Sequence, residues 1–140
     1  MKKTIWAWTY LFLTAGVFIV GCALGGSKLE RVGVFIHNYE PQKFTLQFSV
    51  SNVASKQVKK FVVSMEAAEK GQSTFKSPIL TWKWDKPDLD KSGFDILVEV
   101  LSYPEGKVLC RRNFKKYKEI SLGLGIKKKE GRIVVVNEDI

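Results

Sequence analysis

The residues able to do chemistry are few in this chain of 140 residues. His37 is its only histidine, and Cys22 and Cys110 are its only cysteines. Nucleophilic catalysis through a histidine needs a serine or cysteine held beside it, and no nucleophile-elbow sequence surrounds any serine here. Zinc sites need several His or Cys ligands, which the chain cannot supply. We therefore expect His37 to be a surface or strand-end residue.

Three aspartates share one polar loop and are the remaining candidates for a metal site. Asp85, Asp88 and Asp90 lie close together in the sequence, as calcium ligands often do. The loop lacks the central glycine and distal glutamate of an EF-hand, and Lys86 and Lys91 stand among the carboxylates. We expect a solvated loop and no metal. Because no glycine-rich phosphate motif precedes a helix either, we expect neither an enzyme nor a bound cofactor.

Cys22 is the one residue whose surroundings indicate a defined chemistry. Lys2 and Lys3 precede an apolar, uncharged run from Ile5 to Val20, which ends in Gly21-Cys22 and a small, flexible segment. A basic start, an apolar centre and a small-residue exit are the layout of an export signal. An uncleaved membrane-spanning helix is the main alternative, because Thr4 to Leu24 is long enough to cross a bilayer. A plain signal peptide is favoured less, since no Ala-x-Ala site is present.

The segment Ile19-Val20-Gly21-Cys22 resembles the lipobox of bacterial lipoproteins, with Val20 where a smaller residue is more usual. The resemblance implies cleavage before Cys22 and attachment of diacylglycerol to its sulfur, with acyl chains such as palmitate as the only covalent addition. The mature protein would then be anchored in a membrane of the cell envelope. The residue after the cysteine is Ala23 and not aspartate, which resembles the sorting signal of lipoproteins that are sent to the outer membrane. The domain would then face the periplasm.

These features predict three parts: a lipoprotein signal peptide (1–21), the lipidated cysteine with a short tether (22–30) and one domain (31–140). Removal of the signal leaves 119 residues, which is an ordinary domain size. If Cys22 is acylated, Cys110 has no partner within the chain, so a disulfide framework is excluded. Cys110 is then either a buried thiol or a link to another chain.

Alternating apolar and polar residues after the tether indicate strands, and no segment shows a convincing amphipathic helix. About eight short strands separated by turns predict an all-β fold, a single antiparallel β-sandwich of immunoglobulin-like or transthyretin-like topology. Gly123 and Gly125 predict a strand that another backbone approaches closely or that bends. The expected strands are 32–37, 44–51, 61–66, 79–84, 94–101, 107–114, 120–126 and 132–137.

Two tryptophans share one face of an expected strand. Trp82 and Trp84 are separated by Lys83, which points to the other face. We favour a core position for both tryptophans, with an exposed binding strip as the alternative.

Positive charge is concentrated late in the chain. The mature part carries 21 Lys and Arg against 14 Asp and Glu, a formal charge of +7. The excess indicates either a solvated, lysine-protected sheet edge or contact with anions such as lipid headgroups or an acidic protein. Nucleic acid would also suit the charge but is an improbable partner for an exported, anchored domain. The candidate contact residues are Lys107, Arg111, Arg112, Lys115, Lys116, Lys127, Lys128 and Lys129.

Two functions follow as hypotheses. The first is a non-enzymatic lipoprotein that docks another envelope protein at the membrane, through strand addition at an open sheet edge. In anchor, size and fold class such a chain resembles the accessory lipoproteins and pilotins of bacterial secretion machines, including the transthyretin-like lipoprotein of the type VI membrane complex. The alternative is a lipoprotein that binds an anionic lipid or glycan through its basic loops. A pocket lined by Trp82 or Trp84 would favour the alternative, and a filled core would favour docking.

Overall fold

The structure is a computed structural model that describes residues 29–86 and 93–138. The predicted signal peptide, Cys22 with its predicted lipid, and most of the predicted tether lie outside the described residues. Asp88 and Asp90 of the polar loop lie outside them as well.

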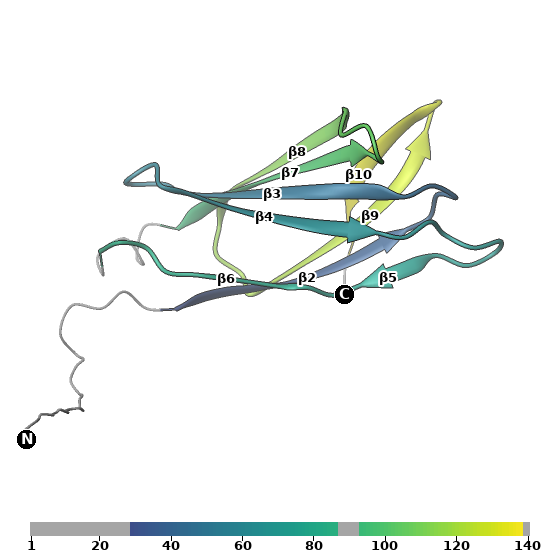
Figure 1. Ribbon diagram of the computed structural model, residues 1–140. Coiled ribbons are helices and arrows are strands. Elements are labelled where there is room, and N and C mark those ends of the chain that lie inside the picture. Colours follow the sequence, from purple (N-terminus) through teal and green to yellow (C-terminus); the bar gives the residue numbers. More distant parts are fainter. Residues whose placement is uncertain (1–28, 87–92, 139–140) are drawn as a thin grey trace, which may run out of the picture.

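Nine strands in the described part of the chain form two sheets that pack face to face (Figure 1). This confirms the all-β sandwich. Sheet one has the order β10-β9-β2, and the other edge of β2 carries both β5 and β6. Sheet two has the order β4-β3-β7-β8. Sheet one contains β2 (Glu30–Asn38), β5 (Thr74–Lys76), β6 (Ile79–Trp82), β9 (Ser121–Lys129) and β10 (Arg132–Asn137); sheet two contains β3 (Phe44–Asn52), β4 (Val58–Met65), β7 (Phe94–Ser102) and β8 (Val108–Tyr117).

One strand pair departs from the antiparallel arrangement that we expected. β2 and β9 run parallel, with Gly33 opposite Ser121 and Asn38 opposite Ile126. All other strand pairs within the two sheets are antiparallel. Alternation along a strand defines its two faces but carries no information on the direction of its neighbour.

The partner of β2 on its other edge is a broken strand. β6 pairs with Glu30–Gly33 and β5 pairs with Ile36–Asn38. Between them the N–H of Val34 donates to the carbonyl of Pro78 at 2.8 Å. β5 was not expected from the sequence, because three residues are too short for alternation to show.

The core lies between the two sheets and is formed by the inward residues of the long strands. Val34 and Ile36 of β2, Phe48 of β3 and Val98 of β7 are fully buried. Trp82 and Trp84 are also buried, which confirms the core position. β6 ends at Trp82, however, so Trp84 follows the strand instead of belonging to it.

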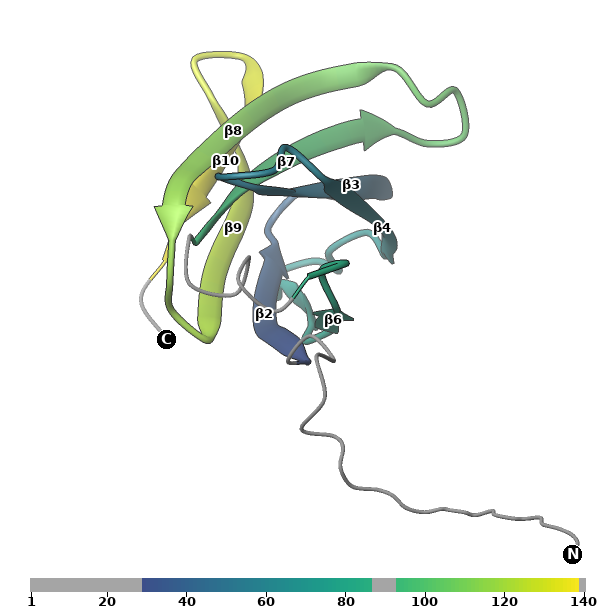
Figure 2. The same ribbon diagram turned by 90° about the vertical axis from the view of Figure 1, so that its left-hand side faces the viewer.

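The two sides of the sandwich differ. On one side β8 lies beside β10, and the Arg112 guanidinium donates to the carbonyl of Val135 at 3.4 Å. On the other side β4 faces β5 and β6 without forming a strand pair with either. Figure 2 shows the sheets converging at β8 and β10 and parting between β4 and β6. We call this second side the open side.

Candidate functional site

The isolated histidine belongs to a hydrogen-bonded group on the outer face of sheet one. Nδ1 of His37 lies 3.4 Å from Oε1 of Glu138. The Tyr39 hydroxyl donates to Oε2 of the same carboxylate at 2.9 Å, and this bond is the main reason that the pKa of Tyr39 is raised. The His37 ring also lies 4.7 Å from that of Phe75.

This group explains one of the two alternating glycines. A Cβ built on Gly125 would lie 2.5 Å from Oε2 of Glu138, so glycine is needed for the carboxylate to cross β9. We expected another backbone to approach this strand, or the strand to bend, whereas at Gly125 it is the Glu138 side chain that comes near. Within residues 29–86 and 93–138, no three His, Cys, Asp or Glu residues gather as a metal site would require. Asp85 accepts a hydrogen bond from the Gln57 amide at 2.9 Å.

The predicted basic residues do not form one patch. Glu30 begins β2 and Ile120 directly precedes β9. Because these two strands run parallel, both residues lie at the same end of the sandwich, which we call the tether end. Lys115 and Lys116 lie near the end of β8 there, whereas Lys107 precedes β8 at the far end. The Arg111 guanidinium donates to the Glu99 carboxylate at 2.7 Å. The contact role of these residues remains a prediction.

The three consecutive lysines lie in a strand and not in a turn. Lys127, Lys128 and Lys129 end β9, and the chain reverses at Glu130-Gly131. Both turn residues have positive φ, 52° and 78°, as a two-residue type I′ hairpin requires. Because successive strand residues point to opposite faces, Lys127 and Lys129 lie on one face of β9 and Lys128 lies on the other.

Cys110 is a half-buried free thiol on β8, opposite Val100. Burial raises its pKa, and hydrogen bonds with the backbone of Val135 and Val100 partly offset this. A raised pKa keeps the sulfur protonated and poorly nucleophilic at neutral pH.

The edge of β4 on the open side carries backbone groups that no strand pairs. The Ser64 carbonyl accepts a hydrogen bond from Nζ of Lys76 at 2.7 Å, so it points away from β3. In an antiparallel strand the N–H and C=O of one residue point to the same side, and the direction repeats every second residue. The backbone N–H and C=O of Val62 and Lys60 therefore also point out to the open side.

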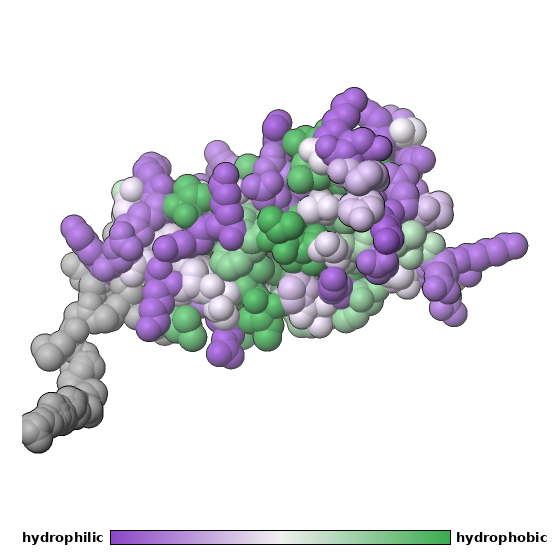
Figure 3. Space-filling view, in the orientation of Figure 1, coloured by the Kyte–Doolittle hydropathy of each residue, from purple (hydrophilic) through white to green (hydrophobic). Residues whose placement is uncertain are grey.

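Side chains of β5 cover only the later half of this edge. The Thr74 hydroxyl donates to the carbonyl of Glu66 at 2.7 Å, next to the Lys76 contact. Farther back on β4, Val58 is 48% exposed and Val62 is 68% exposed. Figure 3 shows apolar residues exposed between hydrophilic ones in the middle of this side, over β4 and toward β6. From Val58 to Val62, β4 is thus an unpaired strand edge that exposes one valine on either side of Lys60.

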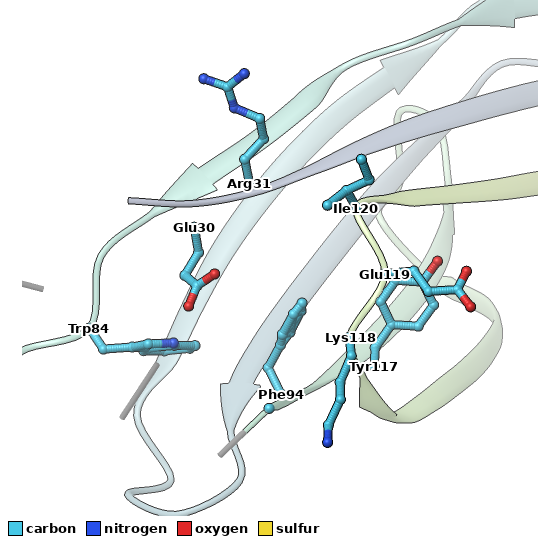
Figure 4. Close-up of a pocket in the computed structure, with 9 residues that line it drawn as sticks. Glu30, Arg31, Trp84, Phe94, Tyr117, Lys118, Glu119 and Ile120 are labelled. Carbon is cyan, nitrogen blue, oxygen red and sulfur yellow. The ribbon is translucent and has the colours of Figure 1, made fainter. Parts of the chain in front are cut away.

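Trp84 borders a small open hollow at the tether end (Figure 4). The hollow measures about 250 Å³ and is also lined by Phe94 and Tyr117. Glu30 points toward Trp84, whereas Arg31 points away from it. The Tyr117 hydroxyl donates to the carbonyl of Ser121, and burial followed by the Glu119 charge raises the pKa of this phenol.

The indole rings themselves are occupied by packing. The Trp82 ring meets those of Trp84 and Phe94 edge to face, with centroids 5.8 and 5.1 Å apart. At 3% exposure Trp84 presents little of its ring to the hollow. The arrangement is that of a filled core with a shallow depression beside it, which is less than a drug-sized ligand usually needs.

No helix in the described part of the chain is long and apolar enough to cross a membrane. No protein-family model matches the chain, and no curated protein matches it. Among solved structures, the chain is similar to a crystal structure of the T6SS lipoprotein TssJ1 from Pseudomonas aeruginosa. The two share 9% sequence identity over 81% of this chain and 99% of the other, with a TM-score of 0.45.

Proposed function

We propose that this chain is a non-enzymatic, lipid-anchored protein of the cell envelope that docks another envelope protein. The observation that carries the docking role is the unpaired edge of β4, where Val62 is 68% exposed beside outward backbone groups. The two tryptophans support the same choice, because Trp82 and Trp84 are only 5% and 3% exposed and pack in the core instead of lining a large apolar pocket. The anchor rests on the sequence around Cys22, as does the outer-membrane, periplasm-facing location. Service in a secretion or envelope assembly is the finer part of the proposal.

The edge indicates the chemistry of its partner. An added strand would place its side chains opposite those of β4, at spacings of about 5 Å. Val58 and Val62 lie four residues apart on one face of β4 and call for apolar residues opposite them, and Lys60 midway between them calls for a carboxylate. We therefore expect an extended segment with two apolar residues four positions apart and an Asp or Glu midway between them.

The anchor is tested by intact mass spectrometry of the membrane fraction, comparing the wild type with Cys22→Ala. We expect a mass that lacks residues 1–21 and includes acyl chains, and we expect this species to be lost in the variant. A full-length, unmodified mass in the wild type would instead indicate a membrane-spanning segment and would overturn the lipoprotein assignment.

The docking edge is tested by photo-crosslinking from position 60 in intact cells. Val62→Pro removes an N–H that points away from β3, so it should leave the sheet intact while blocking strand addition. Val62→Ala is the matched control, because it shortens the side chain and keeps the N–H. We expect Val62→Pro to abolish the crosslink and Val62→Ala to retain it. Equal crosslinking in both variants would exclude strand addition here.

The alternative function, binding of an anionic lipid or glycan, has one observation in its favour. Lys127, Lys128, Lys129 and Arg132 share one hairpin, and within the described residues none of them takes part in a salt bridge. Replacing the three lysines with glutamine preserves the turn and removes the charge. Loss of binding to vesicles containing anionic lipid, with unchanged folding, would support this function, and unchanged binding would refute it.

A further inference from the structure

The outer face of sheet one is apolar at the tether end. Leu29, Ile79 and Ile120 are 49%, 61% and 78% exposed, and together with Phe35 they line an open hollow of about 470 Å³. We call these four residues the tether-end face. When several large aliphatic side chains are exposed side by side on a small domain, they commonly form a contact surface.

Strand pairing brings the members of this face together from three segments, which are β2 with the preceding Leu29, β6, and the start of β9. On β2, Gly33 and Phe35 point outward. Gly33 is paired with Ile79 of β6 on one side and with Ser121 of β9 on the other. The N–H of Gly33 donates to the carbonyl of Ile120 at 2.7 Å, which fixes that residue at the start of β9.

Gly33 forms the floor of the hollow. A Cβ built there would meet only the Ile120 carbonyl and the Phe35 ring, both at 3.8 Å. These are ordinary contact distances, so the position would accept a side chain but has none. The apolar side chains of Ile79 and Ile120 therefore stand as two walls with open space between them.

We infer that the tether-end face rests on the membrane to which the chain is anchored. This inference relies on the lipid anchor of the proposed function. Six residues separate Cys22 from Leu29, and at about 3.5 Å per extended residue they span roughly 20 Å. Leu29 is itself part of the face. Among the surfaces that the structure describes, the tether-end face is therefore the one that the tether keeps closest to the acyl chains on Cys22.

The charges around the face suit a bilayer better than they suit a second apolar protein surface. Arg31 and Glu30 line the same hollow, and Lys118 and Glu119 line the neighbouring one. Lys115 and Lys116 near the end of β8 give this end of the sandwich an excess of positive charge. Aliphatic side chains flanked by long basic ones match the boundary between acyl chains and anionic headgroups. The basic side chains, Arg31 and Lys118 among them, would place their charge in the headgroup layer while the aliphatic groups enter the apolar layer.

The test uses the full-length, acylated protein in vesicles of phosphatidylethanolamine and phosphatidylglycerol. In a Cys110→Ser background, Ile120→Cys carries a polarity-sensitive fluorophore. Val62→Cys is the matched control: Val62 is similarly exposed, but it lies on the outer face of the opposite sheet. Ile79→Cys provides a second reporter on the tether-end face. Lipids with a quencher in the acyl chain then report which label meets the bilayer.

We expect quenching at positions 120 and 79 to exceed that at position 62 at least fivefold, with an emission shift to shorter wavelength. Equal, weak quenching at all three positions in protein shown by mass to be acylated would overturn the inference and leave the anchor intact. Absence of acylation would instead refute the proposed function. Labels shielded from water without lipid quenching would overturn the inference in favour of a protein cover, either a second copy or the chain's own first residues.

Discussion

Asn38 is a wholly buried polar residue that joins the two sheets, and its replacement tests how the sandwich is held at the far end. Its side-chain amide donates to the carbonyls of Gln42 and Glu66, each at 2.9 Å. Its Oδ1 accepts from the N–H of Glu40 at 2.9 Å. One side chain therefore fixes the turn after β2 and ties it to the residue that follows β4.

Asn38→Ala removes three hydrogen bonds and leaves their backbone partners without this side chain. Each such bond contributes about 1 kcal/mol net, and a buried group left unpaired costs somewhat more. We expect the free energy of unfolding to fall by about 3 kcal/mol, which is a large part of the roughly 5–15 kcal/mol of a typical domain.

Asn38→Asp adds a charge to the same geometry and should depend on pH. The carboxylate still accepts from Glu40 but faces two carbonyl oxygens to which it cannot donate. Burial and those oxygens raise the pKa of the new group above its usual value of about 3.9. A group with a raised folded-state pKa contributes stability that is full below the unfolded pKa and is lost as pH rises through the folded value. The deficit of this variant should therefore be smallest near pH 3 to 4 and should exceed that of Asn38→Ala at pH 7.

The assay is urea unfolding followed by tryptophan fluorescence, at neutral and acidic pH. Asn113 on β8 is exposed, so Asn113→Ala and Asn113→Asp are matched controls that should change stability by no more than about 0.5 kcal/mol. A cost below about 1 kcal/mol for Asn38→Ala, or a pH-independent deficit for Asn38→Asp, would refute the assigned network.

Three further outcomes are expected. Gly125→Ala should displace the Glu138 carboxylate and return the pKa of Tyr39 toward 10.0, which a spectrophotometric titration of phenolate would detect; an unchanged titration would mean that Glu138 does not hold Tyr39. Cys110 should react with a disulfide reagent at least tenfold more slowly in the folded protein than in urea at pH 7, because burial raises its pKa; equal rates would place the thiol in water. Phe48→Ala should lower the free energy of unfolding by about 3–5 kcal/mol in the same urea assay, since this ring is fully buried; a loss under about 1 kcal/mol would contradict a rigid core.

The alternation of apolar and polar residues predicted the long strands well because one face of each strand is buried in the core. In β3 every second residue from Phe44 to Asn52 is buried, and β7 repeats the pattern from Phe94 to Val100. Both tryptophans were placed in the core for the same reason. β5 could not be predicted from the sequence because its formation depends on pairing with Ile36–Asn38 and not on its own three residues.

The basic residues show the limit of composition as a guide to a site. Eight basic residues close together in sequence were named as candidates for anion contact, yet β8 and β9 carry them to opposite ends. Arg111 pairs with Glu99 across the sheet, and Arg112 reaches the backbone of β10. A charge count cannot distinguish such pairing from a free cationic patch, because it contains neither register nor strand direction.

Two features of sheet one, the tether-end face and the contact of His37 with Glu138, arise from a strand pairing that the sequence of neither strand predicts. The parallel alignment of β2 with β9 sets Gly33 beside Ser121, which places Ile120 over the tether-end face. The same alignment sets His37 beside Gly125, whose missing side chain admits the Glu138 carboxylate. A shift of one residue in this register would turn the buried residues of β9 outward and would close both features at once. The glycines at alternate positions in β9 are therefore best understood together with β2, and the sequence within either strand could not reveal their purpose.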